Sequence, residues 1–353
     1  MIPSRHLIWL ASVLVPGALH AVDFQRDVRP ILANHCFKCH GPDDKARKAK
    51  LRLDVRPEQD VLKEILLRIY HADVDERMPP AAAKKPLFRA QKKVLRDWVN
   101  KGAVYTEHWA FTAPKKQDRP KVKQADWPRN DIDSFILARL EADGKSPAPE
   151  ADRYRLIRRL SLDLIGLPPT PKQMSAFEKA VIVNRKSALE NTVDALLASP
   201  HFGERWGRHW LDVARYAESS GKEANLTYPH AWRYRDYVID SFNADKPYNQ
   251  FIREQIAGDL MPARDDRHRA ELMTATGFLA LGPKSHNERN RQQFTVDVAD
   301  EQIETMSRSM LGLTIACARC HDHKFDPITQ REYYALAGIF FSTETYFGTG
   351  QSL

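Results

Sequence analysis

The sequence predicts a mainly α protein that consists of a small N-terminal helical domain and a larger helical domain. Apolar residues recur every three or four positions over most of the chain, which is the spacing of an amphipathic helix. Alternating strand patterns are few, and Pro, Gly and helix-capping residues separate the helical stretches. With 353 residues, of which 42% are hydrophobic and 28% charged, the chain can build two ordinary globular cores.

Residues 1–21 have the pattern of a secretory signal peptide. Arg5 supplies a positive charge, Leu7–Val15 forms a short apolar stretch, and Ala21 offers a cleavage site. The apolar stretch is too short to span a bilayer, although an uncleaved anchor or a buried N-terminal helix is an alternative. Because no later segment is apolar enough to cross a membrane, we expect a periplasmic or otherwise exported protein with no membrane span after signal cleavage.

All four cysteines of the chain lie in two Cys-x-x-Cys-His motifs. The first motif comprises Cys36, Cys39 and His40, and the second comprises Cys317, Cys320 and His321. Two thiols three residues apart on one helical turn can each form a thioether to a porphyrin, and the adjacent His can bind its iron. The pattern therefore predicts two covalently attached haem c groups, one at each motif. A shared zinc site, a redox dithiol and two plain disulfides are the alternatives.

Residues 22–103 form the predicted first domain, a cytochrome c-like haem domain. Helical periodicity leads into Cys36, a basic loop at Lys45–Lys50 follows the motif, and an amphipathic helix around Trp98 closes the domain. Met78 precedes two prolines, which stiffen the loop that presents its side chain. Because a soft thioether suits iron, we predict Met78 as the sixth ligand of the first haem, with a surface Met beside a turn as the alternative.

Residues 104–130 contain scattered Pro and Lys without an apolar period, and they predict a linker. The second domain, residues 131–353, has helical patterns throughout and carries the second haem motif near its end. Within it, Thr170, a proline and Gln173 predict a capping box at the start of a helix. Ser187 predicts a second helix cap by the same logic.

His209 is the leading candidate for a distal ligand of the second haem or for a base near it. It lies at helical spacing from Trp206 and Trp210, so the pattern places it in an aromatic core. A hydrogen-bonded core histidine is the alternative. On the other side of the same helix, a stripe of Arg and Asp residues that includes Arg215 could bind haem propionates or an anionic substrate, or form a solvated, salt-bridged face.

The first domain resembles the planctomycete-type cytochrome c domain. That resemblance rests on Asp27–Leu32, Cys36–Pro42, Leu51–Asp54, Arg77–Pro80 and the closing Trp98 helix. The second domain resembles the helical domain that commonly follows it, through Arg159–Pro171, Arg205–Ala217 and Cys317–Ile328. The resemblance implies haem binding, electron transfer and a His and Met ligand pair, which His40 and Met78 match. Such proteins usually continue into a further C-terminal domain, which this chain is expected to lack.

Three functions are compatible with these patterns. We favour an electron-transfer protein that connects an extracytoplasmic dehydrogenase to the respiratory chain over a self-contained oxidoreductase. In the second hypothesis, the haem of the second motif is the reactive centre of a haem-dependent oxidoreductase. In the third, the protein is a polysaccharide-associated binding module that uses exposed aromatics such as Trp127 and Trp232. The net charge of +8 favours a redox partner protein or an anionic polysaccharide, and no basic arm indicates nucleic-acid binding.

Overall fold

The computed structural model describes residues 22–346 and confirms the mainly α prediction. The protein is 58% helical, and within the described residues no strand forms beyond an isolated antiparallel bridge between Ser219 and Thr227. The predicted signal peptide, residues 1–21, lies outside the described residues. Among residues 22–346, every helix falls short of the length and apolar character that crossing a bilayer requires.

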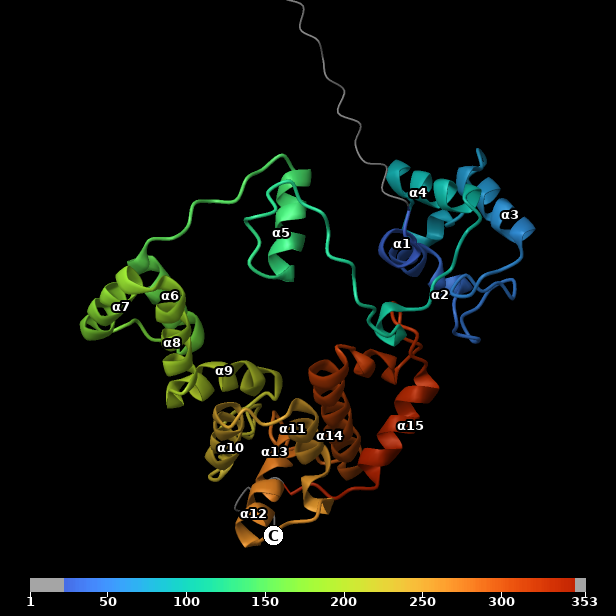
Figure 1. Ribbon diagram of the computed structural model, residues 1–353. Helices are drawn as coiled ribbons and strands as arrows, with labels where there is room; N and C mark the ends of the chain where they lie inside the picture. The colour runs from blue at the N-terminus through green and yellow to red at the C-terminus, as the bar shows by residue number, and fades with distance from the viewer. Residues whose placement is uncertain (1–21, 347–353) are drawn as a thin grey trace, which may run out of the picture. The chain divides into compact units, whose positions relative to one another are not determined.

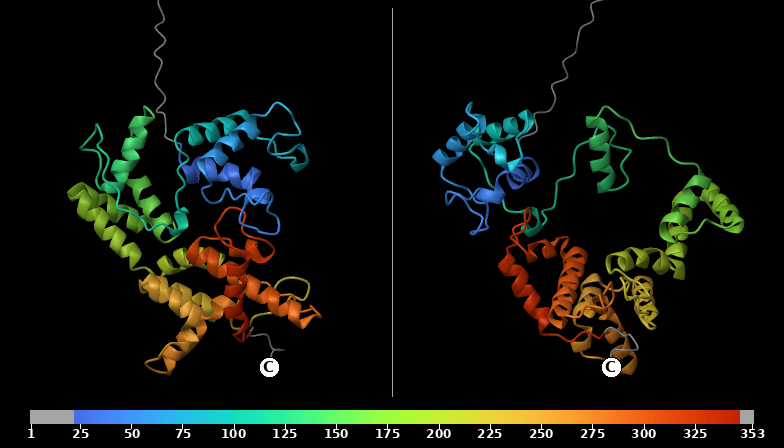
Figure 2. Two further views of the ribbon diagram at one scale, coloured as in Figure 1. Left: turned by 90° about the vertical axis from the view of Figure 1, so that its right-hand side faces the viewer. Right: turned by 180° about the vertical axis from the view of Figure 1, so that it is seen from behind.

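The chain divides into two compact units, whose helices are drawn in Figures 1 and 2. The first unit extends to Thr112 and also contains His321–Thr329, which we call the return segment. The second unit covers Ala113–Cys320 and resumes at Gln330. The predicted linker, residues 104–130, is therefore divided between the two units.

Amphipathic helices around one apolar core make up the first unit. Its elements are η1 (Phe24–Val28), α1 (Arg29–His35), α2 (Phe37–His40), α3 (Gln59–Tyr70), η2 (Ala81–Ala83), α4 (Arg89–Asn100) and η3 (Trp109–Phe111). The core contains Val28, Leu32, Leu62, Leu95 and Trp98. The indole of Trp98 packs against Phe24 and Tyr105, with ring centroids 5.7 and 5.1 Å away, and its N–H donates to the carbonyl oxygen of Val104 (3.1 Å). These contacts pack α4 against the core of the unit.

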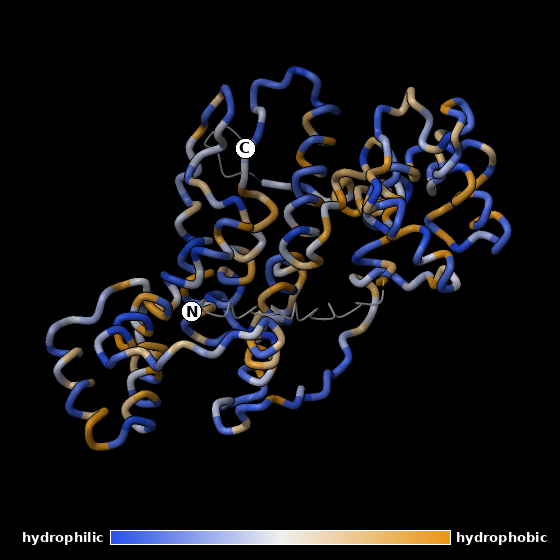
Figure 3. Tube along the Cα trace, turned by 90° about the horizontal axis from the view of Figure 1, so that it is seen from above, coloured by the Kyte–Doolittle hydropathy of each residue, from blue (hydrophilic) through white to orange (hydrophobic). Residues whose placement is uncertain are grey.

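The second unit is a succession of helices joined by short loops. Its elements are α5 (Asp131–Ala142), α6 (Arg153–Leu164), α7 (Pro171–Val183), α8 (Arg185–Leu197), α9 (Pro200–Val213), α10 (Ala231–Asn243), α11 (Tyr248–Ala257), η4 (Gly258–Leu260), α12 (Asp266–Ala275), α13 (Gly277–Ala280), α14 (Arg291–Met306), η5 (Ser307–Leu311), η6 (Ile315–Arg319) and α15 (Gln330–Phe341). Figure 3 shows hydrophobic and hydrophilic residues interspersed along these helices, as amphipathic helices require.

Helix caps test the sequence patterns directly. The capping box of α7 is confirmed, because Thr170 Oγ1 accepts the N–H of Gln173 (3.3 Å) and Gln173 Oε1 accepts the N–H of Thr170 (2.8 Å). The cap predicted at Ser187 is wrong. The capping residue is Asn184, three residues earlier, just before α8 begins at Arg185. Its side chain accepts the N–H of Ser187 (3.1 Å). An extended Asn satisfies the exposed amides of the first turn as well as a Ser does, so it starts the helix first.

Helices α9 and α10 pack with their backbones close together. Gly203 and Gly207 are buried on the face of α9 that meets α10. A Cβ at position 203 would lie 2.4 Å from the carbonyl oxygen of Ile239, so a larger side chain does not fit there. One turn further on, the indole N–H of Trp210 donates to Gln255 on α11 (2.9 Å). Glycines and one tryptophan thus make the contact face of α9.

Candidate haem-binding site

The first Cys-x-x-Cys-His motif folds as one helical turn. The amide of Cys39 donates to the carbonyl oxygen of Cys36 (3.0 Å), and the amide of His40 donates to the same oxygen (2.8 Å). Residues three and four positions apart share a helix face, so this turn groups both thiols with the imidazole. Cys36 packs against the apolar core, and burial raises the pKa of its thiol to about 12. No disulfide joins the four cysteines in this structure.

His40 has the environment of an iron ligand. Its Nδ1 lies 3.3 Å from the carbonyl oxygen of Lys48 in the basic loop, a hydrogen bond in the tautomer that is protonated at Nδ1. Such a bond orients the ring and leaves the lone pair of Nε2 for a metal. Burial lowers the pKa of His40, which favours the neutral imidazole that binds iron. The residues of the first motif therefore fit a covalently attached haem c.

Met78 lies on the loop that connects α3 to α4. Its amide donates to the carbonyl oxygen of Arg68 (3.0 Å). The guanidinium of Arg77 donates to the carbonyl oxygens of His71 (2.8 Å) and Ala72 (2.7 Å). These bonds fix the loop to the end of α3, whose buried face belongs to the same core as the first motif. The thioether side chain is 38% exposed, and its role as sixth ligand stays a prediction.

The second motif begins in the short turn η6. Cys317 and Cys320 are exposed, so their thiols are accessible for attachment. Between them, the guanidinium of Arg319 lies 3.0 Å from Asp297 and 3.3 Å from Asp300, both on α14. The carbonyl oxygen of Arg319 accepts a hydrogen bond from the side-chain amide of Gln330, the first residue of α15 (2.9 Å). Contacts with two helices thus hold the turn that presents the thiols.

The return segment packs within the first unit. The carbonyl oxygen of Phe325 accepts two hydrogen bonds from the guanidinium of Arg29 on α1, at 2.9 and 2.8 Å. The ammonium of Lys324 donates to the side chain of Asn34, also on α1 (2.6 Å). The residues that follow the second Cys-x-x-Cys pair are therefore part of the unit that contains the first motif.

Two buried histidines support the return segment. His323 Nδ1 accepts the amide N–H of Phe325 (3.2 Å) and of Asp326 (2.8 Å), which closes a tight turn. His108 Nε2 lies 3.2 Å from the carboxylate of Asp326. Both histidines are 7% exposed, and burial lowers the pKa of His108 although Asp326 opposes the shift. The sequence patterns placed His108 in the linker at residues 104–130. They could not show its partner Asp326, which is remote in the chain.

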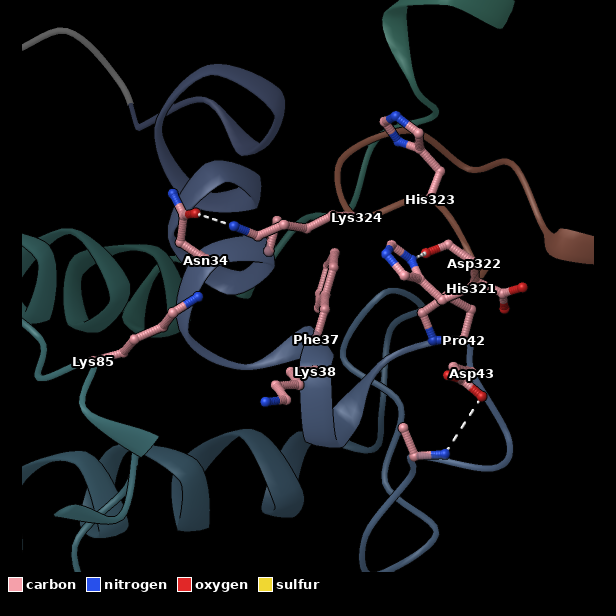
Figure 4. Close-up of a pocket in the computed structure, with 12 residues that line it drawn as sticks. Asn34, Phe37, Lys38, Pro42, Asp43, Lys85, His321, Asp322, His323 and Lys324 are labelled. Carbon is pink, nitrogen blue, oxygen red and sulfur yellow. Dashed lines mark hydrogen bonds between the residues drawn. The ribbon is translucent and has the colours of Figure 1, made fainter. Parts of the chain in front are cut away.

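A cavity of about 350 Å³ lies in the first unit (Figure 4). His321 lines it together with Phe37 and Lys38, which are the two residues between the cysteines of the first motif. His321 Nδ1 lies 2.8 Å from the carbonyl oxygen of the next residue, so Nε2 is again the nitrogen left for a metal. Lys85 and Lys324 add positive charge to the cavity wall. His321 of the second motif and the two residues between the cysteines of the first motif share this one cavity.

Comparison with known families assigns both parts of the chain. Residues 131–345, more than half of the chain, match PSCyt2, described as a protein of unknown function (DUF1549). The chain belongs to the PSCyt2 family. Residues 36–82 match PSCyt1, the Planctomycete cytochrome C family, so the predicted family and the order of the two domains are confirmed. The cytochrome c domain implies haem c in this PSCyt2 protein. No curated protein and no solved structure matches the chain.

His209, in the PSCyt2 part, is exposed, and its predicted place in an aromatic core is wrong. The face of α9 that contacts α10 is made by small residues instead, because the two backbones approach too closely for an imidazole. The ring of His209 packs against Trp206 on the same helix, with centroids 5.5 Å apart. Its role as sixth ligand of the second haem stays a prediction.

Other candidates in the PSCyt2 part differ in their surroundings. Arg215, from the predicted polar stripe, is mostly buried, and its Nη1 lies 2.7 Å from Glu301 Oε1. Trp127 and Trp232 are exposed, at 38% and 43%, as a carbohydrate-binding role would require. The stripe therefore does not act as one surface, since Arg215 belongs to a buried cluster.

Proposed function

We propose that this PSCyt2 protein is an exported c-type cytochrome with two haems, which transfers electrons between an extracytoplasmic dehydrogenase and the respiratory chain. The observation that carries the proposal is the cavity shared by His321, Phe37 and Lys38. Because iron bonds directly to imidazole, a haem on the second motif must reach this cavity. Phe37 and Lys38 lie between the two thioether positions of the first haem. The arrangement supports direct electron exchange between the two haems.

The chain's own residues have distinct tasks in this function. The cysteines tether each haem, while His40 and His321 hold the iron and keep their Nδ1 atoms bound to backbone carbonyls. The bound haems supply the reversible one-electron chemistry. Around the first motif, the apolar core excludes water from one side of the site. Lys85 and Lys324, together with Lys38, are positioned to bind propionate carboxylates.

The basic loop after the first motif is the proposed docking surface for an acidic redox partner. Lys45, Lys48 and Lys50 are exposed, and the carbonyl of Lys48 contacts His40. Arg47 plays another part, because its guanidinium donates to the carbonyl oxygen of Gly41 (2.9 Å). Docking through exposed lysines should accelerate association at low ionic strength and slow it as salt is added. The sixth ligands assigned to Met78 and His209 complete the proposal.

A haem count tests the dihaem part. Pyridine haemochrome analysis and intact mass of the exported protein should give two haems. Replacing both cysteines of one motif by serine, Cys36→Ser with Cys39→Ser or Cys317→Ser with Cys320→Ser, should leave one haem in each case. A wild-type count of one would refute the second site. A bound haem whose α-band shows no reversible redox change would refute electron transfer.

A haem-dependent oxidoreductase is the second candidate. It is favoured by a further cavity, in the PSCyt2 part, that includes Ala316, the residue before Cys317. In that case the second haem has an open coordination position next to a substrate. High-spin absorption with cyanide binding at only one haem would support this candidate. Two fully low-spin haems would refute it.

A further inference from the structure

A separate cavity of about 270 Å³ lies in the second unit, where the start of α10 meets α12 and α13. These three helices pack side by side (Figure 1). The wall of the cavity is mainly apolar and includes Ala231, Met273, Ala280 and Leu281. No residue of either Cys-x-x-Cys-His motif lines it. Because pockets for drug-sized ligands measure about 300–1000 Å³, this one suits a smaller molecule.

The hydroxyl groups inside the cavity are already bonded to the protein. Tyr228 is buried and donates to the carbonyl oxygen of Gly282 (3.1 Å). Tyr234 is buried as well, and its hydroxyl donates to the side chain of Gln255. The hydroxyl of Thr274 donates to a backbone carbonyl oxygen one turn earlier on α12 (2.7 Å). The two tyrosines therefore offer their rings to the cavity, and its interior favours an apolar group.

The rim of the cavity carries a positive charge. Arg233 is exposed, and its Cζ lies over the ring of Trp232, 5.1 Å from the ring centroid. Within residues 22–346, the guanidinium of Arg233 forms no ion pair and donates no hydrogen bond to the protein. His230, which is also exposed, lines the same rim and can donate a further hydrogen bond. The donors of this rim are therefore available to a ligand.

Acidic side chains are absent from the described lining of the cavity. The carboxylate of Asp236, on the next turn of α10, pairs with Arg235 (2.8 Å). Near the end of the described chain, Glu344 accepts the hydroxyl of Tyr346, which lines the cavity (3.0 Å). A bound anion would thus meet the charge of the rim without a carboxylate of the lining to repel it.

We propose that this cavity binds a one-ring aromatic carboxylate, with its ring against the two tyrosines and its carboxylate on Arg233. A guanidinium that lies over an indole keeps its N–H donors for a planar anion, which their fork geometry matches. An aromatic ring can contact the tyrosine rings by edge and by face. A sugar fits less well, because the lining has no Asp, Asn, Glu or Gln to pair with its hydroxyls.

Calorimetric titration of the full-length, haem-loaded protein with sodium benzoate tests the proposal. Benzoate should bind at one site. Benzamide has the same ring without the charge, and acetate has the charge without the ring. Each should bind at least about tenfold more weakly than benzoate, because each lacks one of the two interactions. Benzoate should leave the Soret band unchanged, since no haem-motif residue lines the cavity.

Two variants at the rim test the position of the carboxylate. Arg233→Gln should weaken benzoate binding by about tenfold or more, because it removes a charge-assisted hydrogen bond. Met273→Glu places a negative charge at the lining and should weaken binding as well. The matched control is Arg253→Gln on α11, outside the lining, which should keep the wild-type affinity. All three side chains are exposed, so the variants should fold, as far-UV circular dichroism would verify.

The proposal is overturned if benzoate does not bind, or if benzamide or acetate binds as tightly. It is also overturned if Arg233→Gln keeps the wild-type affinity for benzoate. A Soret shift together with unchanged affinity in Arg233→Gln would place benzoate on a haem iron instead. The site uses no haem, so a haem count that refutes the dihaem function leaves this test valid.

Discussion

Two glycines on one helix should respond to the same substitution with opposite signs. Gly203 and Gly207 are both buried on α9, four residues apart, and both face α10. A Cβ at position 203 would lie 2.4 Å from the carbonyl oxygen of Ile239 and 2.6 Å from Nδ2 in the side chain of Asn243. At position 207 the nearest atom, Cγ1 of Val238, would be 3.4 Å away, which is an ordinary contact.

The magnitudes follow from these distances. Gly203→Ala forces the two backbones apart, and overpacking of this kind costs about 1–3 kcal/mol. It also displaces Asn243, whose side chain accepts the amide N–H of Gly203 (2.7 Å), at a further cost of about 1 kcal/mol. The better helix propensity of Ala returns about 1 kcal/mol. We therefore expect Gly203→Ala to lower the free energy of unfolding by about 1–3 kcal/mol. Gly207→Ala should raise it by up to about 1 kcal/mol.

Thermal unfolding followed by far-UV circular dichroism measures both variants. For a unit of this size, each kcal/mol corresponds to roughly 2–4 °C in Tm. Hydrogen exchange of peptides from α9 and α10 assigns the change to this helix pair. If Gly203→Ala is as stable as the wild type, or if both variants shift in the same direction, the close packing of α9 on α10 is incorrect.

Three further predictions concern the first unit. Arg29→Gln removes the paired donors to the Phe325 carbonyl, so amide exchange across the return segment should rise about tenfold, and unchanged exchange would contradict the contact. In haem-free protein at pH 8, burial keeps Cys36 as a thiol with a pKa of about 12, so iodoacetamide should modify the exposed cysteines of the second motif first, as peptide mass spectrometry would show. Burial lowers the pKa of His108 in the folded protein. The unfolded chain, where His titrates at about 6.5, therefore binds a proton at this residue more readily than the folded chain does. Protection of the return segment should then be complete above about pH 6.5 and fall below it, and His108→Gln should remove that pH dependence.

Two local patterns correctly predicted features that neighbouring residues decide. The spacing of Cys36, Cys39 and His40 specifies one helical turn, and the turn forms. The capping box at Thr170 depends only on residues three positions apart, and it too forms as expected. In both cases the partners are neighbours in the chain, so no tertiary contact could overrule the pattern.

The exposure of His209 and the burial of Arg215 could not be predicted in this way. A hydrophobicity pattern assigns the aromatic side of α9 to the core. In the structure the side with Gly203 and Gly207 packs against α10 instead, because glycines let the two backbones come close together. Arg215 has the pattern of a solvated charge, and its burial depends on Glu301, which lies far along the chain. Backbone approach and remote ion pairs have no local signature.

The contact between Arg29 and Phe325 sets an order of assembly. The two residues are 296 positions apart, and the chain is synthesised from its N-terminus. The first motif is therefore made before the residues that complete its unit. Closing a loop of this length costs on the order of 5 kcal/mol in chain entropy. Folding of the intervening helical unit restricts that loop and lowers its closure cost, so the return segment is the last part to complete the unit that contains the first motif.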